Sequence, residues 1–479
     1  MTRAARPRAL RTAIILCLAA ATGGCGDVSD VASPADARPN VVVIVLDTVR
    51  ADALSCYGNT EPLTPHVDAV ARDGTRYATT YATCFWTLPS HASLLTGLYP
   101  SEAGATSETN HLPETVETLA ERLRRDGYAT GAVVRNPWLS VERGFAQGFD
   151  VFVEAWRTTE VPEIEAEHAA VGAAVEWMAE RAREPAPFFL FVNLNLAHLP
   201  YTPSDEALQH VATREWPPDH VERMRGIESG WGHLTGRLEL QASDYELLRE
   251  LYHAEVWLLD AMVGELDRAL HELGVADRTV LVVTSDHGEN LGEHGRIDHV
   301  LSMYEPTVRV PLVIRGPGIP AGDVVTEPVS LVDVTPALLA ACSVPDRDAS
   351  GASRSNGASP FTRDAVYAEN RRPVNGVRLL ERWFPDFDAS SIDHPMRMVR
   401  SGSDKLIWTA DVGTELYDLD TDPGESLDLS GRRSDRRDDL LAILRQWALG
   451  QRPVAGQVPE VAGRDRENLE RLRRLGYVE

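Results

Sequence analysis

The chain has 479 residues, of which 43% are hydrophobic and 25% charged, and its formal net charge is −25. This length is enough for a large buried core, and the composition is that of an ordinary globular protein. An acidic surface repels nucleic-acid backbones and anionic membranes, so neither is expected as a general partner. An anionic substrate would need a local cationic centre, such as a metal ion.

The first 25 residues are typical of an export signal. Four arginines precede the apolar run "AIILCLAAA" (13–21), which is too short to span a bilayer, and small residues stand just before Cys25. This pattern predicts a lipoprotein signal with acylation at Cys25. The protein would then be periplasmic or attached to the cell envelope, with membrane contact through this N-terminal anchor alone. Residues 26–38 are expected to form a flexible tether.

Apolar runs next along the chain predict buried strands. They are "NVVVIVLD" (40–47), "PFFLFVNLNLAH" (187–198), "RTVLVVTSDHGE" (278–289) and "VRVPLVIRGPG" (308–318). Nearly continuous apolar runs fit strands that are covered on both faces, as in a parallel sheet. Helical patterns alternate with them, including a long amphipathic one at 243–274. The alternation predicts an α/β fold with a mainly parallel central sheet sandwiched by helices.

The composition changes after this pattern ends. Residues 346–365 are rich in Gly, Ser, Asp and Arg, which is typical of a linker or loop. Residues 366–479 contain shorter elements, with polar turns between candidate antiparallel strands and a helix at 436–449. We therefore expect a main α/β domain at 39–345 and a small C-terminal α+β subdomain.

Polar side chains follow the ends of three predicted strands. Asp47 ends the first strand, His198 follows the second, and Asp286 and His287 come directly after the third. In open parallel sheets, ligands bind beyond the carboxyl ends of the strands. These side chains are therefore expected at one edge of the sheet, which predicts a site there.

The stretch "CFWTLPSHASLLTG" (84–97) is expected to be a turn that runs into a short helix. Pro89 suits the first turn of a helix and Gly97 suits its end. Thr87 stands at the start, where free N–H groups and the helix dipole favour an anion. In isolation such a Thr would be read as a helix cap. Together with two carboxylates and an imidazole, its hydroxyl can bind a divalent cation.

Several motifs, in the same order, resemble the sulfatase family of the alkaline-phosphatase-like superfamily. They are "PNVVVIVLDTVRADALSCYG", "TLPSHASLLTGLYP", "LVVTSDHGENLGEHG", "HVLSMYEPTVRVPLVIRGPG", "ELYDLDTDPGE" and the terminal "LRRLGYVE". The resemblance covers roughly residues 39–479. It implies the alkaline-phosphatase-like fold, a catalytic function for the main domain and an anionic ester as the substrate.

The resemblance also implies two groups of site residues. The metal ligands would be Asp47, Thr87, Asp286 and His287. Thr87 would also be the nucleophile. The residues that contact the substrate anion and assist catalysis would be His91, His198 and His299.

The sequence departs from the family pattern at several of these positions. Sulfatases place Cys in the motif C-x-P-x-R and convert it to formylglycine, whereas this chain has "TLPSH" from Thr87 to His91. Thr cannot be oxidised to that aldehyde, so no formylglycine is expected. Thr48 replaces the second of the paired Asp residues, and His287 replaces the Asn of the last ligand pair. Fewer carboxylates and an imidazole favour Mn²⁺ or Zn²⁺ over Ca²⁺.

One further departure concerns the family's Lys-x-x-His segment. It has become "VVRNPW" (133–138), so that contact is lost or moved, and Asn136 is a possible substitute.

The replacement of formylglycine by Thr87 also affects which class of ester can be hydrolysed. A formylglycine hydrate can expel sulfate by collapsing to the aldehyde, but a threonyl ester must be cleared by attack at its central atom. This favours phosphoester chemistry: a phosphodiesterase, a phosphomonoesterase, or a phosphoglycerol- or phosphoethanolamine-type transferase. Two alternatives stay open at this point. One is a sulfuric-ester hydrolase that uses Thr87, and the other is an inactive protein that binds anionic glycans.

Overall fold

The computed structural model describes residues 38–452, except 159–160, 300 and 347–362. The expected export signal, Cys25, the tether except Arg38, and the terminal motif "LRRLGYVE" lie outside the described residues, as does most of the expected linker at 346–365. The described residues from Arg38 onward belong to one compact unit. Among them, no helix combines the length and the apolar character needed to cross a membrane.

Eight strands form the central sheet, in the order β12-β2-β11-β7-β1-β6-β4-β5. In chain order they are β1 (Asn40–Leu46), β2 (Thr75–Tyr77), β4 (Ala129–Val134), β5 (Val151–Glu154), β6 (Phe188–Leu194), β7 (Thr279–Thr284), β11 (Leu312–Arg315) and β12 (Asp323–Val325). All neighbours from β7 to β5 pair in parallel, and β12 is parallel to β2. The prediction of a mainly parallel sheet is confirmed.

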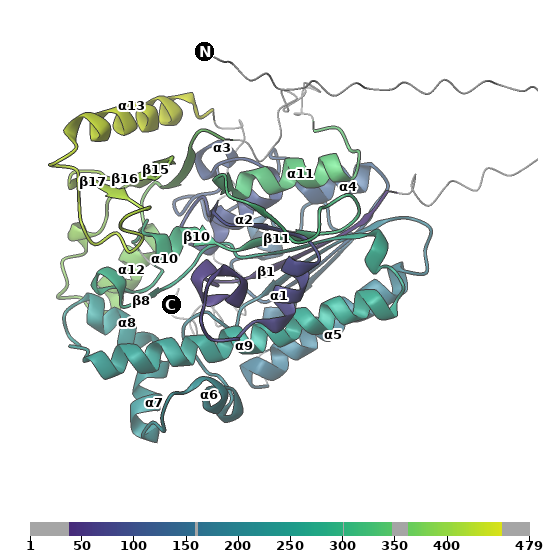
Figure 1. The fold of residues 1–479 in the computed structure, drawn as a ribbon, viewed down its shortest axis with the longest axis horizontal. Helices are drawn as coiled ribbons and strands as arrows, with labels where there is room; N and C mark the ends of the chain where they lie inside the picture. Colours follow the sequence, from purple (N-terminus) through teal and green to yellow (C-terminus); the bar gives the residue numbers. More distant parts are fainter. Residues whose placement is uncertain (1–37, 159–160, 300, 347–362, 453–479) are drawn as a thin grey trace, which may run out of the picture. The chain divides into compact units, whose positions relative to one another are not determined.

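Helices cover both faces of this sheet, with α5 and α9 on one side and α2, α4 and α11 on the other (Figure 1). The helices are α1 (Pro65–Arg72), α2 (Thr87–Thr96), α3 (Pro100–Ala103), α4 (Leu119–Arg125), α5 (Glu163–Arg181), α6 (Asp205–Val211), α7 (Pro218–Arg225), α8 (Ile227–Leu234), α9 (Ala242–Glu272), α10 (Glu305–Val308), α11 (Val334–Ala341), α12 (Val374–Trp383) and α13 (Ser434–Gly450). Successive side chains of a strand point to opposite faces. Accordingly, Val41 and Val43 pack in one core and Val42 and Ile44 in the other.

The predicted strand at 308–318 is divided in the structure. It forms β10 (Arg309–Val310) and β11, on either side of Pro311. Proline has no N–H to donate to a ladder, so it separates the two strands. β10 joins a small sheet with β3 (Thr80–Tyr81) and β13 (Val329–Ser330), whereas β11 pairs antiparallel with β7.

A second, antiparallel sheet lies in the C-terminal part of the chain. Its strands are β14 (Val366–Asn370), β15 (Met396–Ser401), β16 (Asp404–Thr409) and β17 (Gly413–Asp418). Leu440 and Leu444 of α13 pack in its small core. The remaining strands, β8 (Asn290–Leu291) and β9 (Ile297–Asp298), form a hairpin. The expected antiparallel strands are thus present, while the domain boundaries stay a prediction.

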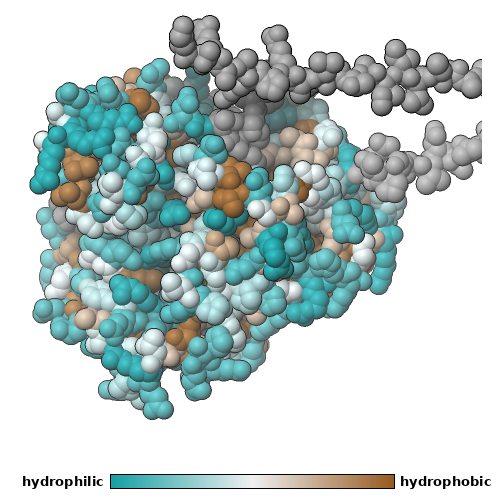
Figure 2. Space-filling model, in the orientation of Figure 1, coloured by the Kyte–Doolittle hydropathy of each residue, from teal (hydrophilic) through white to brown (hydrophobic). Residues whose placement is uncertain are grey.

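The surface agrees with the acidic composition. The face shown in Figure 2 is mostly hydrophilic, with hydrophobic residues in small separate groups. Single exposed apolar residues such as Val412 and Leu449 are ordinary on a folded protein. This face therefore presents no broad apolar surface.

Candidate active site

Thr87 is the first residue of α2, and its hydroxyl does not cap the helix. The cap residue is Trp86, which makes no capping hydrogen bond through its side chain. Instead, Thr87 Oγ1 accepts a hydrogen bond from Asn136 Nδ2 at 3.2 Å and lies 3.5 Å from His287 Nε2. The helix is tied to the sheet because Ser90 Oγ donates to the carbonyl of Asp286 at 2.6 Å. The hydroxyl therefore belongs to a site rather than to a cap.

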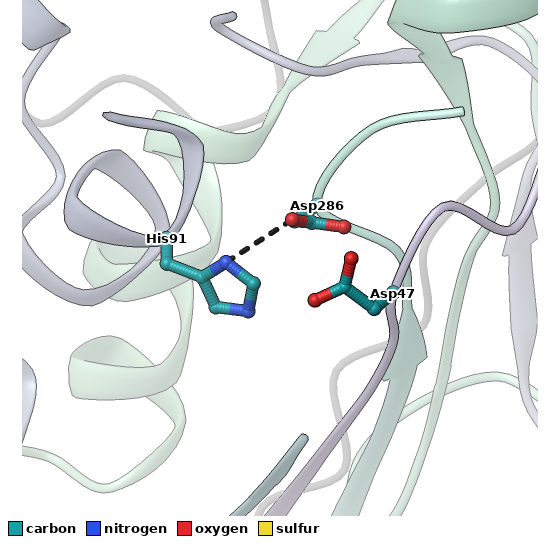
Figure 3. Close-up of side chains that lie close together, drawn as sticks. All are labelled: Asp47, His91 and Asp286. Carbon is teal, nitrogen blue, oxygen red and sulfur yellow. Dashed lines mark ion pairs between the residues drawn. The ribbon is translucent and has the colours of Figure 1, made fainter. Parts of the chain in front are cut away.

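Two carboxylates and an imidazole converge beside this hydroxyl (Figure 3). Asp47 follows β1, Asp286 follows β7, and His91 projects from α2 toward both. One ligand atom from each of the three lies within 4.8 Å of the others, and all three side chains are buried. His91 Nδ1 is 3.2 Å from Asp286 Oδ2, and His287 Nε2 is 3.3 Å from the same oxygen. The carboxyl ends of neighbouring strands thus bring together the residues that the sequence predicted.

The donor set fits a divalent cation. Asp47 Oδ1 is a buried oxygen without a hydrogen-bond partner among the described residues, and Asp286 Oδ2 contacts only the imidazoles of His91 and His287 there. A buried carboxylate oxygen without a partner is costly, and a cation is the usual remedy. His91, assigned from the sequence to the substrate, stands as close to Asp286 as His287 does. Two carboxylates and two imidazoles form a mixed N and O set, which suits Mn²⁺ or Zn²⁺ better than Ca²⁺.

The two carboxylates differ in their electrostatics. Burial, together with the charge of Asp286, raises the pKa of Asp47 to about 7. Burial also opposes ionisation of Asp286, but His287 and His91 hold the pKa of Asp286 well below its ordinary value. Like charges close together in a buried site disfavour each other. The pair therefore stays doubly charged near neutral pH only when a positive charge lies between the two groups.

His287 presents a lone pair to the site. Its Nδ1 lies 3.0 Å from the carbonyl oxygen of Gly288, and a carbonyl can only accept, so Nδ1 carries the proton. Burial lowers the pKa of His287 to about 3, which keeps the ring neutral. Its Nε2, facing Thr87, is therefore free of a proton and able to bind a cation.

His198 and His299 lie next to this group, as the resemblance implied. The ring centroids of His299 and His287 are 4.5 Å apart, and those of His198 and His299 are 5.0 Å apart. Burial, and then the charge of His299, lower the pKa of His198 to about 4. Its Nδ1 donates to the carbonyl of Leu199 at 2.6 Å. His198 therefore presents an acceptor at Nε2 in the absence of an anion.

His299 has the opposite character. Its Nδ1 lies 2.9 Å from Asp298 Oδ1 and 3.5 Å from Glu289 Oε2. Although burial opposes protonation, Asp298 and Glu289 raise the pKa of His299 well above its ordinary value. Asp298 is held in turn by Trp231, whose Nε1 donates to Asp298 Oδ2 at 2.9 Å. His299 is thus the cationic imidazole of the site.

Sequence reasoning undervalued the asparagines around Asp47. Asn136 Nδ2 and Asn193 Nδ2 donate to Asp47 Oδ2 at 2.9 and 3.0 Å. Asn136 also contacts Asn195 Oδ1 at 3.3 Å, beside its bond to Thr87. The available signal for Asn193 and Asn195 was the pair of amides at the end of an otherwise apolar strand pattern. Asn136 therefore connects Asp47 with the Thr87 hydroxyl.

Thr48, in the place of a second Asp, does not add an oxygen to the cation site. Its backbone N–H donates to Asp286 Oδ1 at 3.3 Å, and its hydroxyl donates to the carbonyl of Ala197 at 2.6 Å. The hydroxyl is thus used to hold the loop after β6. The site consequently has fewer carboxylates than the family pattern.

Comparison with known proteins fits this architecture. A solved structure in complex with D-glucosamine-2-N,6-O-disulfate has a TM-score of 0.68 and 22% identity, covering 90% of this chain and 99% of that one. The phosphonate monoester hydrolase of Agrobacterium radiobacter has a TM-score of 0.67 and 23% identity, covering 86% of this chain and 96% of that one. Both show the same fold. Fold and site together define the class as α/β proteins with an acid–imidazole site at the carboxyl ends of a mainly parallel sheet.

Sequence relatives narrow this class. A family model described as Sulfatase matches residues 39–344. Arylsulfatase K of Homo sapiens is 26% identical over 457 residues, 86% of this chain and 82% of that protein. The N-acetylglucosamine-6-O-sulfatase of Bacteroides thetaiotaomicron is 24% identical over 491 residues, 85% of this chain and 86% of that protein. The chain belongs to the sulfatase family.

Proposed function

We propose that this chain is a metal-dependent hydrolase of anionic esters in which Thr87 replaces formylglycine as the nucleophile. The observation that carries the proposal is the position of Thr87 Oγ1, 3.5 Å from His287 Nε2 and bonded to the amide that also holds Asp47. Asp47, Thr87, Asp286 and His287 would hold one divalent ion, Mn²⁺ or Zn²⁺, and His91 would join them as a further ligand. When bound, the ion would neutralise the carboxylates, lower the pKa of the Thr87 hydroxyl and polarise the ester.

The remaining residues have roles that follow from their protonation. Asn136 Nδ2 donates to Thr87 Oγ1 and so directs a lone pair of this oxygen. His299 holds a proton at Nε2, because its Nδ1 proton faces Asp298. That second proton can pass to the leaving alcohol as its bond to the central atom breaks. Water then attacks the central atom of the threonyl ester and gives a proton back to His299 Nε2, while the bond between that atom and Thr87 Oγ1 breaks. His198 would contact an anion oxygen once it is protonated.

The nature of Thr favours phosphorus as the central atom of the ester, in a phosphate diester or monoester. Unlike a formylglycine hydrate, the threonyl ester has no route to an aldehyde, so water or an acceptor alcohol must attack the central atom. A sulfate ester is the second candidate, because the relatives named above are sulfatases. With an alcohol as acceptor, the same site would work as a phosphoglycerol- or phosphoethanolamine-type transferase.

The test is a comparison of Thr87→Ala with the unaltered protein on four substrates. These are an aryl phosphate, a bis-aryl phosphate, a phosphonate monoester and an aryl sulfate, each with Mn²⁺, Zn²⁺ or Ca²⁺. We expect Thr87→Ala to lose turnover on all of them while its circular dichroism and Tm remain normal. Unchanged turnover in Thr87→Ala would remove Thr87 as the nucleophile. The preferred substrate of the unaltered protein decides between phosphorus and sulfur.

We also propose that the protein is exported and anchored by a lipid on Cys25. The support is the sequence of the first 25 residues, with its arginines, short apolar run and small residues before the cysteine. In cells, Cys25→Ala is expected to move the protein from the membrane fraction to the soluble periplasmic fraction. An unchanged distribution would contradict the anchor.

A further inference from the structure

A hollow that is partly open to solvent lies beside His299 and is lined mainly by apolar side chains; about 420 Å³ in and around it, open solvent included, is free of protein atoms. Its walls include Phe85, Trp86, Trp138, Trp231 and Leu379, all less than 10% exposed. The rings of Trp86 and Trp138 meet edge to face, with centroids 5.0 Å apart. Four large aromatic side chains therefore form part of the wall of the hollow.

Two of these tryptophans connect the hollow directly to the nucleophile. Trp86 immediately precedes Thr87 in the chain. The backbone N–H of Trp138 donates to Asn136 Oδ1 at 2.9 Å, and the other end of that amide donates to Thr87 Oγ1. Two residues of the lining are therefore direct neighbours of Thr87 and of the amide bonded to it.

The third tryptophan connects the hollow to the cationic imidazole. Trp231 is on α8, its indole N–H is bonded to Asp298, and it packs with Leu379 of α12 (Figure 1). His299, which follows Asp298, lines the same hollow. The proton donor proposed for the leaving group thus stands at the wall of the hollow.

The polar lining offers one unused donor. Asn370 is 4% exposed, and its Nδ2 has no hydrogen-bond partner among the described residues. By contrast, Asn375 and Asn110 bond to each other through their side-chain amides, at 2.7 and 3.2 Å. The hydroxyl of Ser107 donates to a backbone carbonyl. A sugar with several hydroxyls would leave most of them unpaired here, which costs binding energy.

The charges around the hollow do not favour an anionic leaving group. The arginines that follow Asn370 are both paired with carboxylates: Arg371 with Glu108 at 3.7 Å, and Arg372 with Asp393. The chain as a whole carries a net charge of −25. A second anionic group, as on a multiply sulfated sugar, would enter an apolar space within an acidic protein.

We propose that this hollow selects an uncharged aryl leaving group with a single hydrogen-bond acceptor, which Asn370 Nδ2 recognises. The inference rests on the proposed hydrolase function and adds to it the chemical class of the alcohol that leaves the ester. The aromatic side chains match a flat ring, and the one donor matches one acceptor. His299, the cationic side chain of the lining, already pairs with Asp298 at 2.9 Å and leaves little attraction for a second anion.

The first test needs no variant. With the central atom kept constant, kcat/KM is measured for phenyl, acetylphenyl and carboxyphenyl esters and for a hexose 6-ester. After correction for leaving-group pKa, kcat/KM for the acetylphenyl ester is expected to be roughly threefold to tenfold higher than for the phenyl ester. This ratio is the effect expected from one added hydrogen bond. The carboxyphenyl and hexose esters are expected to be at least about tenfold poorer, because they bury unpaired polar groups. Preference for the hexose or the carboxyphenyl ester would overturn the inference.

The second test is Asn370→Ala, with Asn375→Ala as the matched control. Asn370→Ala is expected to lower kcat/KM for the acetylphenyl ester to the value for the phenyl ester, and to leave kcat/KM for the phenyl ester unchanged. Asn375→Ala loses an amide from the same hollow, but that amide is already paired, so kcat/KM for the acetylphenyl ester should stay higher. An equal loss on both esters in Asn370→Ala would contradict recognition by Nδ2.

A binding measurement separates this inference from the proposed function. Calorimetric titration of Thr87→Ala with 4-acetylphenol reports on the hollow without any turnover. Saturable binding that is weakened in the double variant with Asn370→Ala supports the inference. Absence of binding, in a Thr87→Ala protein that has lost turnover as expected, would overturn the inference and leave the proposed function standing. Full turnover in Thr87→Ala would overturn the proposed function instead.

Discussion

Two buried groups of the same composition behave differently in this molecule. Each has two carboxylates and one imidazole with ligand atoms within 4.8 Å of one another, and the groups are Asp47, His91 and Asp286, and Glu289, Asp298 and His299. In the second group the imidazole lies between the acids, because His299 Nδ1 is 2.9 Å from Asp298 and 3.5 Å from Glu289. In the first group His91 pairs with Asp286 alone, and Asp47 Oδ1 faces no donor among the described residues.

The imidazoles do not account for the difference, because Asp286 raises the pKa of His91 against the effect of burial, as Asp298 does for His299. The first group is set apart by Asp47 Oδ1, which is buried without a donor among the described residues. Asp298 is satisfied on both oxygens by His299 and Trp231, and burial raises the pKa of Glu289 to about 8. The second group thus supplies its own cation, as an imidazolium beside one charged and one neutral acid. The first group contains two facing carboxylates whose repulsion a metal ion would relieve.

Removal of metal is expected to have the largest effect. Chelation should stop turnover completely, and Mn²⁺ or Zn²⁺ should restore it better than Ca²⁺ because imidazoles belong to the site. An ion added at about 100 times its Kd should also stabilise the folded state by roughly 2.7 kcal/mol. Activity assays and thermal unfolding check both effects. Preferential rescue by Ca²⁺ would contradict the ligand set.

Asp286→Asn tests whether the first group, Asp47, His91 and Asp286, binds the metal ion. It removes the charge that faces both His91 and His287, so turnover should fall by more than about 10³-fold with weaker metal binding. The matched control is Asp260→Asn, a buried Asp of α9 that accepts backbone hydrogen bonds from Val67 and His66. This control is expected to lower Tm and to keep metal affinity. Similar metal affinity in both variants would contradict the assignment.

Asn136→Ala tests the amide that the sequence undervalued. Loss of its bonds to Asp47 and Thr87 should lower metal affinity or kcat by about 10- to 100-fold, as for other groups that orient metal ligands. Asn40→Ala is the control, since Asn40 lies at the opposite end of β1 and bonds to Thr279 and Phe188. Equal metal affinity and kcat in the two variants would show that Asn136 has only a structural role.

Asp298→Asn is expected to have the smallest effect and separates the second group from the first. It keeps an oxygen for Trp231 but removes the charge that holds the proton on His299. We expect kcat to fall about tenfold, more for esters with poor leaving groups than for good ones, while metal affinity is unchanged. A marked loss of metal would mean that the two groups share an ion.

The sequence was sufficient to predict the architecture, because the apolar runs of β1, β6 and β7 are long and lead to polar residues at one edge of the sheet. The sequence was also sufficient to predict that Thr87, His91 and Asp286 lie close together. It could not assign Asn136, because an isolated amide after a strand carries no periodic signal and its partner Asp47 is 89 residues away in the chain. It could not separate the two acid–imidazole groups either, because this depends on atomic distances.

The most direct test of the account is the metal content of purified protein, measured together with that of Asp286→Asn and Asp298→Asn. The account predicts one divalent ion per chain in the unaltered protein, none in Asp286→Asn and one in Asp298→Asn. Protein that is active without a bound ion, or that loses its ion only in Asp298→Asn, would contradict it.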